Sequence, residues 1–284
     1  MTELARTSTS RKAPRSGRDL PVATVVGVAM LVTVVLSLFI RKEVFVAVAL
    51  VAVGACLWEL AQAFARRDIH LPLLPLLVGS VGILVSAYLA GSEALLVSFM
   101  LTAGGVVVWR VLDGNGPAAL RDSTAGIFAA GYLPFLAGFV MLMLSMPDGA
   151  RRVLLFVLLA VASDVGGYTA GVLVGRHPLA PSVSPKKTWE GLAGSVVLSC
   201  VVGAVGIAWG FHANPLIGLG LGLATVTTAT IGDLSESLLK RDLELKDMGS
   251  LLPGHGGVLD RLDSLLLTAP VVYLVLLVSL PVGD

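Results

Sequence analysis

Charged side chains gather in one segment of an otherwise apolar chain, residues 233–263, which holds seven of the 19 acidic residues and four bases. On a helix, Asp233 and Glu236 would share a face, and Asp260 and Asp263 repeat the same spacing of three residues. Two such pairs facing each other would form an oxygen-rich site for a hard divalent cation. Magnesium takes one or two carboxylates together with substrate phosphates and water, so the spacing favours a metal–phosphate site.

The bases of the same segment would supply the positive charge that a polyphosphate needs. They are Lys240, Arg241, Lys246 and Arg261. The Gly-His-Gly-Gly turn at 254–257 would present backbone N–H groups to phosphate oxygens. Each feature also has an ordinary interpretation, because Glu236 and Lys240 could simply pair on a solvated helix and His255 alone is more often a turn or core residue. Taken together, acids at both ends of the segment with bases between them favour the metal–phosphate interpretation.

The composition shows which kind of protein must position these groups. Hydrophobic residues make up 56% of the 284 residues and charged residues 14%, with a mean hydropathy of +0.89. Soluble domains are roughly 45–50% apolar and about 25% charged, so the solvent of this chain must be largely lipid. The net charge of +1 indicates no strongly acidic or basic partner such as a nucleic acid. The two cysteines, Cys56 and Cys200, lie in apolar runs and exclude a disulfide scaffold or a cysteine zinc site.

Nine apolar runs are long enough to span a bilayer as helices, so the sequence predicts an all-α integral membrane protein, a polytopic bundle of about nine transmembrane helices. The runs are 20–40, 44–64, 72–90, 94–110, 124–146, 152–175, 191–211, 215–232 and 264–282. Before them, residues 1–19 are polar and rich in Ser, Thr and Arg, which predicts a disordered tail. After the eighth run, the apolar spacing of 233–245 predicts that the helix continues with one apolar face.

The distribution of Lys and Arg predicts the orientation. With nine spans and a cytoplasmic N-terminus, 16 of these residues fall in inner segments and 4 in outer ones. Both long polar loops, 176–190 and 233–263, are then cytoplasmic, and so is the site that they would form. A miscounted span would reverse every later loop, so the bias also favours the count of nine.

Three motifs in the second half of the chain match a known family. From Ser237 to Asp263 the chain reads SLLKRDLELKDMGSLLPGHGGVLDRLD, which resembles the signature of phosphatidate cytidylyltransferases (CDP-diacylglycerol synthases). The fixed positions of that signature are matched by Ser237, Lys240, Arg241, Lys246, Asp247, His255, Gly256, Gly257, Asp260, Arg261 and Asp263. SPKKTWEG at 184–191 is similar to a second block of the family. SDVGGYTAGVLVGR at 163–176 resembles a third block, from which Gly167 and Thr169 depart.

The resemblance covers residues 160–284 and implies a membrane enzyme that condenses CTP with phosphatidic acid to CDP-diacylglycerol and pyrophosphate. It implies dependence on Mg²⁺, with a second cation such as K⁺, and an all-helical homodimer in the cell (inner) membrane. We expect three regions in the chain: a cytoplasmic tail at 1–19, N-terminal transmembrane helices at 20–150, and a catalytic transmembrane region at 151–284.

The resemblance also assigns roles to residues. Metal ligands are expected at Asp233 and Asp260, with Asp164 as a further candidate. Substrate-binding residues are expected at Ser184, Lys187, Thr188, Ser237, Gly256 and Gly257. Catalytic residues are expected at Lys240, Arg241, Lys246, Asp247, His255, Arg261 and Asp263. No covalent nucleophile is required, because a phosphate monoester is already largely dianionic at neutral pH, and the main obstacle is charge repulsion.

Two other functions stay open at this point. Nine spans alone would suit a transporter, whose acids would bind a coupling ion, but no internal repeat is evident. A CDP-alcohol phosphotransferase would need a D-G-x-x-A-R motif followed by spaced aspartates. The Asp-Gly pairs at 113–114 and 148–149 lack that spacing.

Overall fold

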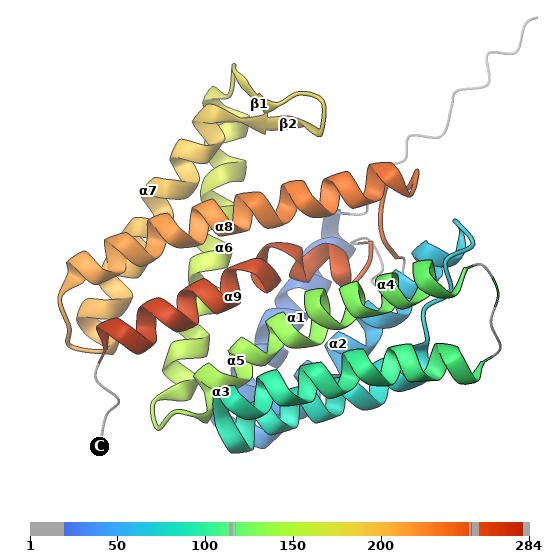
Figure 1. The fold of residues 1–284 in the computed structure, drawn as a ribbon. Helices are drawn as coiled ribbons and strands as arrows, with labels where there is room; N and C mark the ends of the chain where they lie inside the picture. Colours follow the sequence, from blue (N-terminus) through green and yellow to red (C-terminus); the bar gives the residue numbers. More distant parts are fainter. Residues whose placement is uncertain (1–19, 114–115, 117, 250, 252–255, 281–284) are drawn as a thin grey trace, which may run out of the picture.

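Over the residues that the structure describes, helices make up the regular secondary structure apart from one short hairpin, and loops connect them (Figure 1). The computed structural model describes residues 20–113, 116, 118–249, 251 and 256–280, with side chains from residue 25 onward. The helices are α1 (Leu20–Ile40), α2 (Lys42–Ala65), α3 (Leu73–Leu112), α4 (Ala119–Ala130), α5 (Leu136–Ser145), α6 (Gly149–Val174), α7 (Trp189–Val205), α8 (Pro215–Asp242) and α9 (Leu259–Ser279). Two π-helical turns, η1 (Gly131–Phe135) and η2 (Gly206–Gly210), join α4 to α5 and extend α7. The predicted tail at 1–19 lies outside the described residues.

Seven helices within the described residues are long and apolar enough to cross a membrane, by length and composition. In that count α4, η1 and α5 form one span, and α1 adds a shorter apolar stretch, Val25–Ile40. Many of their large apolar side chains, such as Val51, Leu89 and Val278, are exposed on the outside of the bundle. The predicted class, an all-α polytopic membrane protein, is confirmed. The count of nine spans stays a prediction.

Helix α3 is a helical hairpin rather than one rod. Its 40 residues would measure about 60 Å if straight, but Gly91 has a φ of 83°, a conformation that glycine adopts without strain. Beyond that residue the chain runs back along itself. The hydroxyl groups of Ser86 and Ser98 are 2.8 Å apart, and Gly79 packs against Thr102. The reversal falls between the two apolar runs that the sequence separates at this point.

The connecting loops gather at two ends of the bundle. At one end, Arg67 after α2 forms an ion pair with Glu244 after α8 at 2.8 Å, and the Nε of Arg241 donates to the carbonyl of Val183 at 2.7 Å. At the other end, Lys42 donates to the carbonyl of Met146 at 2.5 Å and so joins the α1–α2 and α5–α6 turns. Loops that the sequence predicts on the inner side therefore contact one another at one end of the bundle. The two turns joined by Lys42 at the other end are both predicted on the outer side. Which end faces the cytoplasm stays a prediction.

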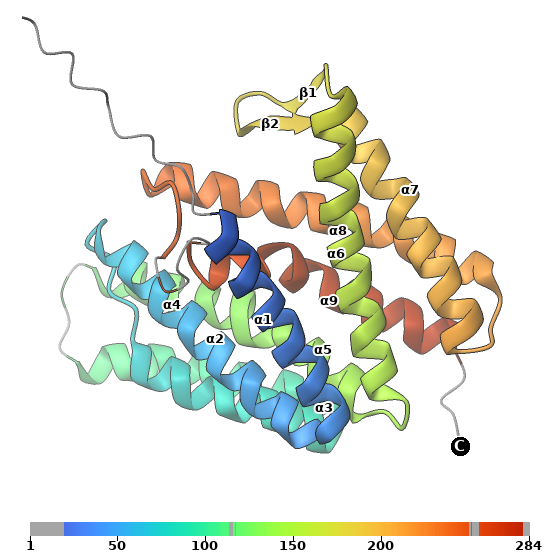
Figure 2. The same cartoon turned by 180° about the vertical axis from the view of Figure 1, so that it is seen from behind.

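Small residues bring the helices of the second half of the chain together. A side chain at Gly166 on α6 would overlap the backbone of Gly194 on α7, and Gly203 on α7 lies in the same way against Gly218 on α8. Close backbone approach of this kind is typical of helix packing in membranes. Figure 2 shows α1 and α6 in front of α8 and α9, with α2 beside α1.

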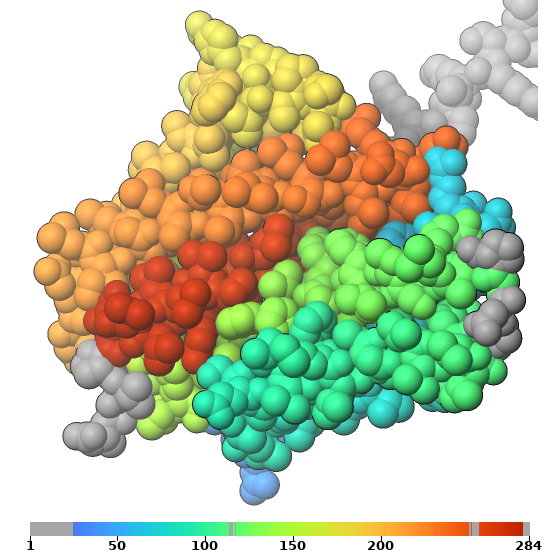
Figure 3. All heavy atoms as spheres, viewed as in Figure 1, coloured from blue at the N-terminus to red at the C-terminus, as the bar shows by residue number. Residues whose placement is uncertain are grey.

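The loop between α6 and α7 forms a hairpin that the sequence analysis did not predict. Strands β1 (Pro178–Ala180) and β2 (Ser184–Thr188) pair antiparallel, with Pro178 opposite Thr188 and Ala180 opposite Ser184. Figure 3 shows this segment, in yellow, projecting from the body of the molecule above α8. Proline cannot donate to a strand ladder, and each strand contains one, so the composition indicated only a loop.

Candidate active site

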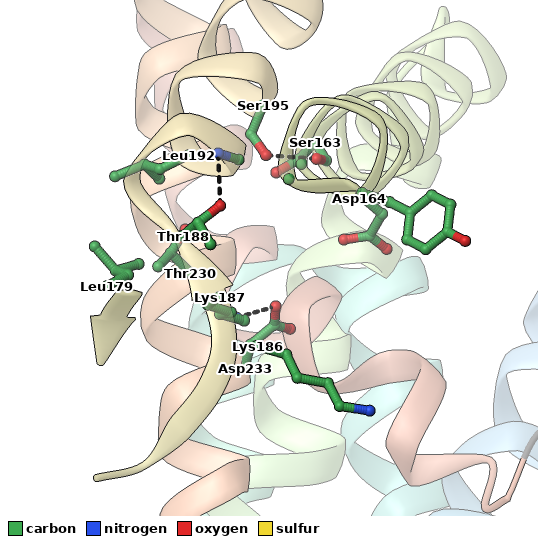
Figure 4. A pocket seen from close by; sticks show the side chains of 14 residues that line it. Ser163, Asp164, Leu179, Lys186, Lys187, Thr188, Leu192, Ser195, Thr230 and Asp233 are labelled. Atoms are coloured by element: carbon green, nitrogen blue, oxygen red, sulfur yellow. Dashed lines mark hydrogen bonds and ion pairs between the residues drawn. The ribbon is translucent and has the colours of Figure 1, made fainter. Parts of the chain in front are cut away.

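A cavity of about 200 Å³ opens between α6, β2, α7 and α8 (Figure 4). Its lining residues are Ser163, Asp164, Gly167, Tyr168, Gly171, Leu179, Lys186, Lys187, Thr188, Gly191, Leu192, Ser195, Thr230 and Asp233. Four of the residues predicted for the site, Asp164, Lys187, Thr188 and Asp233, therefore share one cavity although they come from three separate segments of the chain.

An ion pair joins the two predicted site loops at this cavity. The Nζ of Lys187 on β2 lies 2.5 Å from Oδ2 of Asp233 on α8, and each side chain is 28% exposed (Figure 4). Asp164 lines the same cavity from α6. It is exposed and lies close enough to Asp233 for their charges to repel. Two carboxylates and an ammonium group thus face the same space.

Local hydrogen bonds explain why Lys187 is held at this position. Thr188 is the N-cap of α7, where its hydroxyl accepts from the backbone N–H of Gly191 at 3.1 Å. Glu190, in the first turn of α7, accepts from the backbone N–H groups of Arg176 and His177 at 3.1 and 3.2 Å. Both ends of the hairpin are therefore tied to the start of α7. The capping role of Thr188 was not predicted, and its substrate contact stays a prediction.

A second cluster of charges lies at the junction of α8 and α9. Lys240 donates to Glu236 at 2.6 Å and to Asp260 at 3.1 Å, and the two carboxylate side chains are 1% and 5% exposed. Glu236 also lies close enough to Asp263 for their charges to repel, and its Oε1 is buried without a hydrogen-bond partner among the described residues. The acid pairs of α8 and α9 thus face each other, as the metal-site hypothesis required. Asp263 in turn lies within electrostatic range of Asp233, so this cluster adjoins the cavity.

Asp260 organises the loop between α8 and α9. Its Oδ2 accepts from the backbone N–H of Gly257 at 2.8 Å, and its two oxygens accept from the N–H of Met248 at 3.2 and 3.1 Å. With Lys240 added, both oxygens are engaged. Asp260 is not among the residues that line the cavity. Its predicted metal ligation stays a prediction, whereas its contacts show a role in holding the loop.

The remaining described residues that were predicted for the site are not among those that line the cavity. Arg241 holds the hairpin through Val183, and Arg261 lies within electrostatic range of Asp164. Ser184 pairs in β2 away from the cavity. The other predicted residues differ in exposure. Ser237, Asp247 and Gly256 are half-buried, Gly257 is buried, and Lys246 is exposed. His255 lies outside the described residues.

The donors at the cavity fit a hard divalent cation in part. Among the described residues, no group of three or more His, Cys, Asp or Glu side chains lies together as a complete set of metal ligands. Asp164 and Asp233 supply two carboxylates whose mutual repulsion a cation would relieve. Magnesium needs only one or two carboxylates when phosphates and water complete its shell, so these two residues fit.

Comparison with known proteins finds relatives that match almost the whole chain. The model of the cytidylyltransferase family matches residues 21–279. A phosphatidate cytidylyltransferase of Mycobacterium leprae (strain TN) is 37% identical over 287 residues, which cover 96% of this chain and 92% of that protein. The protein of the same name from Mycobacterium bovis (strain ATCC BAA-935 / AF2122/97) is 35% identical over 288 residues, 96% of this chain and 93% of that protein.

More distant relatives match shorter stretches. The phosphatidate cytidylyltransferase of Synechocystis sp. (strain ATCC 27184 / PCC 6803 / Kazusa) is 35% identical over 215 residues, 65% of this chain and 72% of that protein. The matches confirm the resemblance seen in the motifs and extend it to the first half of the chain, where the sequence showed only generic membrane helices. The chain therefore belongs to the cytidylyltransferase family of nucleotidyltransferases.

Proposed function

We propose that the protein is a phosphatidate cytidylyltransferase, which condenses CTP with phosphatidic acid to give CDP-diacylglycerol and pyrophosphate in phospholipid biosynthesis. A phosphate oxygen of phosphatidic acid forms a bond to the α-phosphorus of CTP. The bond from that phosphorus to the α,β-bridging oxygen breaks, and its electron pair leaves with pyrophosphate. The observation that carries the proposal is the contact between Lys187 and Asp233, which joins two separate family motifs at one cavity. The names of the relatives support it.

The chain's own residues answer the electrostatic problem of this reaction. A dianionic phosphate must approach a polyanionic nucleotide, so the barrier is charge repulsion more than the need for a base. Lys187 at the cavity and Lys240 at the α8–α9 junction are both already paired with carboxylates. The pairs hold both ammonium groups in place before substrate arrives, which lowers the reorganisation needed in the transition state. We assign phosphate contacts to these lysines and to Arg241 and Arg261.

We propose Mg²⁺ as the divalent cation of the reaction, held by Asp233 with Asp164, and with Asp260 as a further ligand. K⁺ is a candidate for a second cation. When bound, the divalent ion would neutralise phosphate charge and help align attack on the α-phosphorus. The half-buried hydroxyl of Ser237, one turn after Asp233, is assigned a metal or phosphate contact rather than the role of a nucleophile.

The cellular setting is proposed on the same basis. The Lys and Arg bias supports a multi-pass protein of the cell inner membrane with its N-terminus and both motif loops in the cytoplasm, where CTP is available. The resemblance supports a homodimer. We assign the chemistry to residues 151–284, which contain α6, α7, α8 and α9, and a supporting role to residues 20–150.

The purified protein in mixed micelles tests the proposal directly. It should release pyrophosphate from CTP when phosphatidic acid and Mg²⁺ are present, and radiolabel from the cytidine should appear in the lipid phase. Reactions without phosphatidic acid, with diacylglycerol in its place, or with UTP or ATP are the controls, and Asp260→Asn is the inactive comparison. Failure to form a labelled lipid from CTP under these conditions would contradict the proposal.

A further inference from the structure

A buried acid from the N-terminal helices reaches the family signature. Glu59 on α2 is 0% exposed, and it belongs to none of the three motifs. Its Oε2 accepts from the backbone N–H of Leu259, the first residue of α9, at 3.0 Å. Its Oε1 is buried and has no hydrogen-bond partner among the described residues. Burial of a carboxylate is costly, so its placement at this point of the loop calls for a reason.

Two glycines of the segment between α8 and α9, Gly249 and Gly257, enclose the Glu59 carboxyl group, and only Gly257 is a fixed position of the signature. A side chain at Gly249 would overlap its Cδ and Oε1, and one at Gly257 would lie 2.5 Å from its Oε2. Gly257 also donates its N–H to Asp260 at 2.8 Å. The backbone therefore packs closely against Glu59 at Gly257, three residues before Asp260. Glycine at these two positions is explained by contact with Glu59, without reference to any bound phosphate.

The first N–H groups of a helix have no partner within the helix. At the start of α9, the Asp260 carboxylate accepts a hydrogen bond from the N–H of Gly257. The Glu59 carboxylate accepts one from the N–H of Leu259. Glu59 thus links the start of α9 to α2, and Asp260 links it to Lys240 on α8. Three helices are joined at one turn of backbone.

We propose that Glu59 is a positioning residue for the reaction. It fixes the start of α9 and the loop around Gly249 and Gly257, and through them it sets where the carboxylate of Asp260 and the ammonium group of Lys240 stand relative to the cavity. It contacts neither substrate. This inference rests on the proposed function for its catalytic consequence, whereas its structural part, the anchoring of the loop, does not.

The test uses two substitutions that differ in what they keep. Glu59→Gln retains an oxygen acceptor for the N–H of Leu259, whereas Glu59→Ala removes it. Displacement of reacting groups by about 1 Å costs on the order of 100-fold in rate. We expect Glu59→Ala to lower kcat by that amount, with a smaller change in KM for CTP, and Glu59→Gln to recover most of the loss. The matched control is Ser80→Ala, a buried polar residue that bonds only within α3.

A second readout follows the loop without any activity. Leu251 is exposed, so Leu251→Cys can be alkylated. The background is Cys200→Ser, and Cys56 is retained because it lies one turn from Glu59. The parent without Leu251→Cys measures the background. We expect Glu59→Ala to raise the alkylation rate severalfold, and Ser80→Ala to leave it unchanged.

Each outcome decides the matter. Wild-type kcat and wild-type alkylation in Glu59→Ala would overturn the proposal, and so would a loss of kcat that Glu59→Gln does not relieve. If Glu59→Ala does not fold, Gly249→Ala displaces the same loop from the other side and should give the same two defects. If the wild-type protein shows no phosphatidate-dependent turnover, the proposed function fails, and alkylation alone then decides whether Glu59 anchors the loop.

Discussion

The substitution Asp233→Asn separates a metal-binding carboxylate from one that merely holds a lysine. The asparagine side chain has the same size and can still accept a hydrogen bond from Lys187, but it carries no charge. If Asp233 binds the divalent cation of the reaction, turnover should fall sharply while the fold remains intact. If Asp233 serves only to hold Lys187, turnover should fall no further than it does in Lys187→Ala.

The expected magnitudes differ widely between activity and stability. Loss of one ligand from a catalytic metal is expected to lower kcat on the order of 10³-fold, which is about 4 kcal/mol of transition-state stabilisation. The ion pair itself is partly solvated, since each partner is 28% exposed. Pairs of this kind contribute about 0–1 kcal/mol to stability, so the unfolding temperature in detergent should change by no more than a few degrees.

The assay is pyrophosphate release from CTP in phosphatidic acid micelles, measured over a titration of Mg²⁺. Asp242→Asn on the same helix is the matched control: Asp242 is exposed and is not among the cavity residues, and the change should leave kcat within about twofold. A cycle with Lys187→Ala and the double variant then measures the coupling between the two residues. Near-wild-type turnover of Asp233→Asn at saturating Mg²⁺ would refute the assignment. A double variant no worse than Lys187→Ala alone would reduce Asp233 to a support for the lysine.

Three further results are expected. Lys187→Ala and Lys240→Ala should each lower kcat/KM for CTP and combine non-additively if they serve one transition state, whereas independent effects in the cycle would assign the loops to different substrates. Single cysteines at Pro185 and Leu251 should react with an impermeant reagent in inside-out vesicles, and labelling from outside intact cells would reverse the topology. Asp122→Ala should destabilise the protein by about 3–5 kcal/mol, because its buried carboxylate accepts from Arg110 at 2.7 Å; an unchanged unfolding temperature would show that this pair contributes little.

Much of the architecture follows from local pattern. Apolar runs of about 20 residues predicted the membrane class because the bilayer sets the length of a spanning helix. The spacing of Asp233, Glu236, Asp260 and Asp263 predicted that the members of each acid pair share a helix face. The metal-site hypothesis further required the two pairs to face each other. Lys240 between Glu236 and Asp260 shows that the pairs do meet. The hairpin at 178–188 was missed, since its prolines suppress the strand pattern.

The positions of individual acids were harder to foresee. The resemblance indicated Asp233 and Asp260 as metal ligands, with Asp164 as a further candidate, and of these three the cavity contains Asp233 and Asp164. Asp260 instead accepts from Met248 and Gly257. The backbone N–H groups that an acid meets depend on how a loop folds back, and the order of residues in that loop does not specify this. The engagement of both Asp260 oxygens is therefore a property of the tertiary structure alone.

The sequence by itself determined that the protein lies in a membrane, that it is helical, and where its two polar loops and family motifs fall. Each of these depends only on composition or on spacing along the chain. Tertiary structure decided which distant residues meet. Lys187 forms an ion pair with Asp233. Glu59, on a helix without a family motif, accepts a hydrogen bond from the first residue of α9, 200 residues later in the chain. Such contacts depend on the close packing of helices at their glycines and on the scarcity of water around buried charges, which favours a hydrogen-bond partner from whichever segment the fold places nearby.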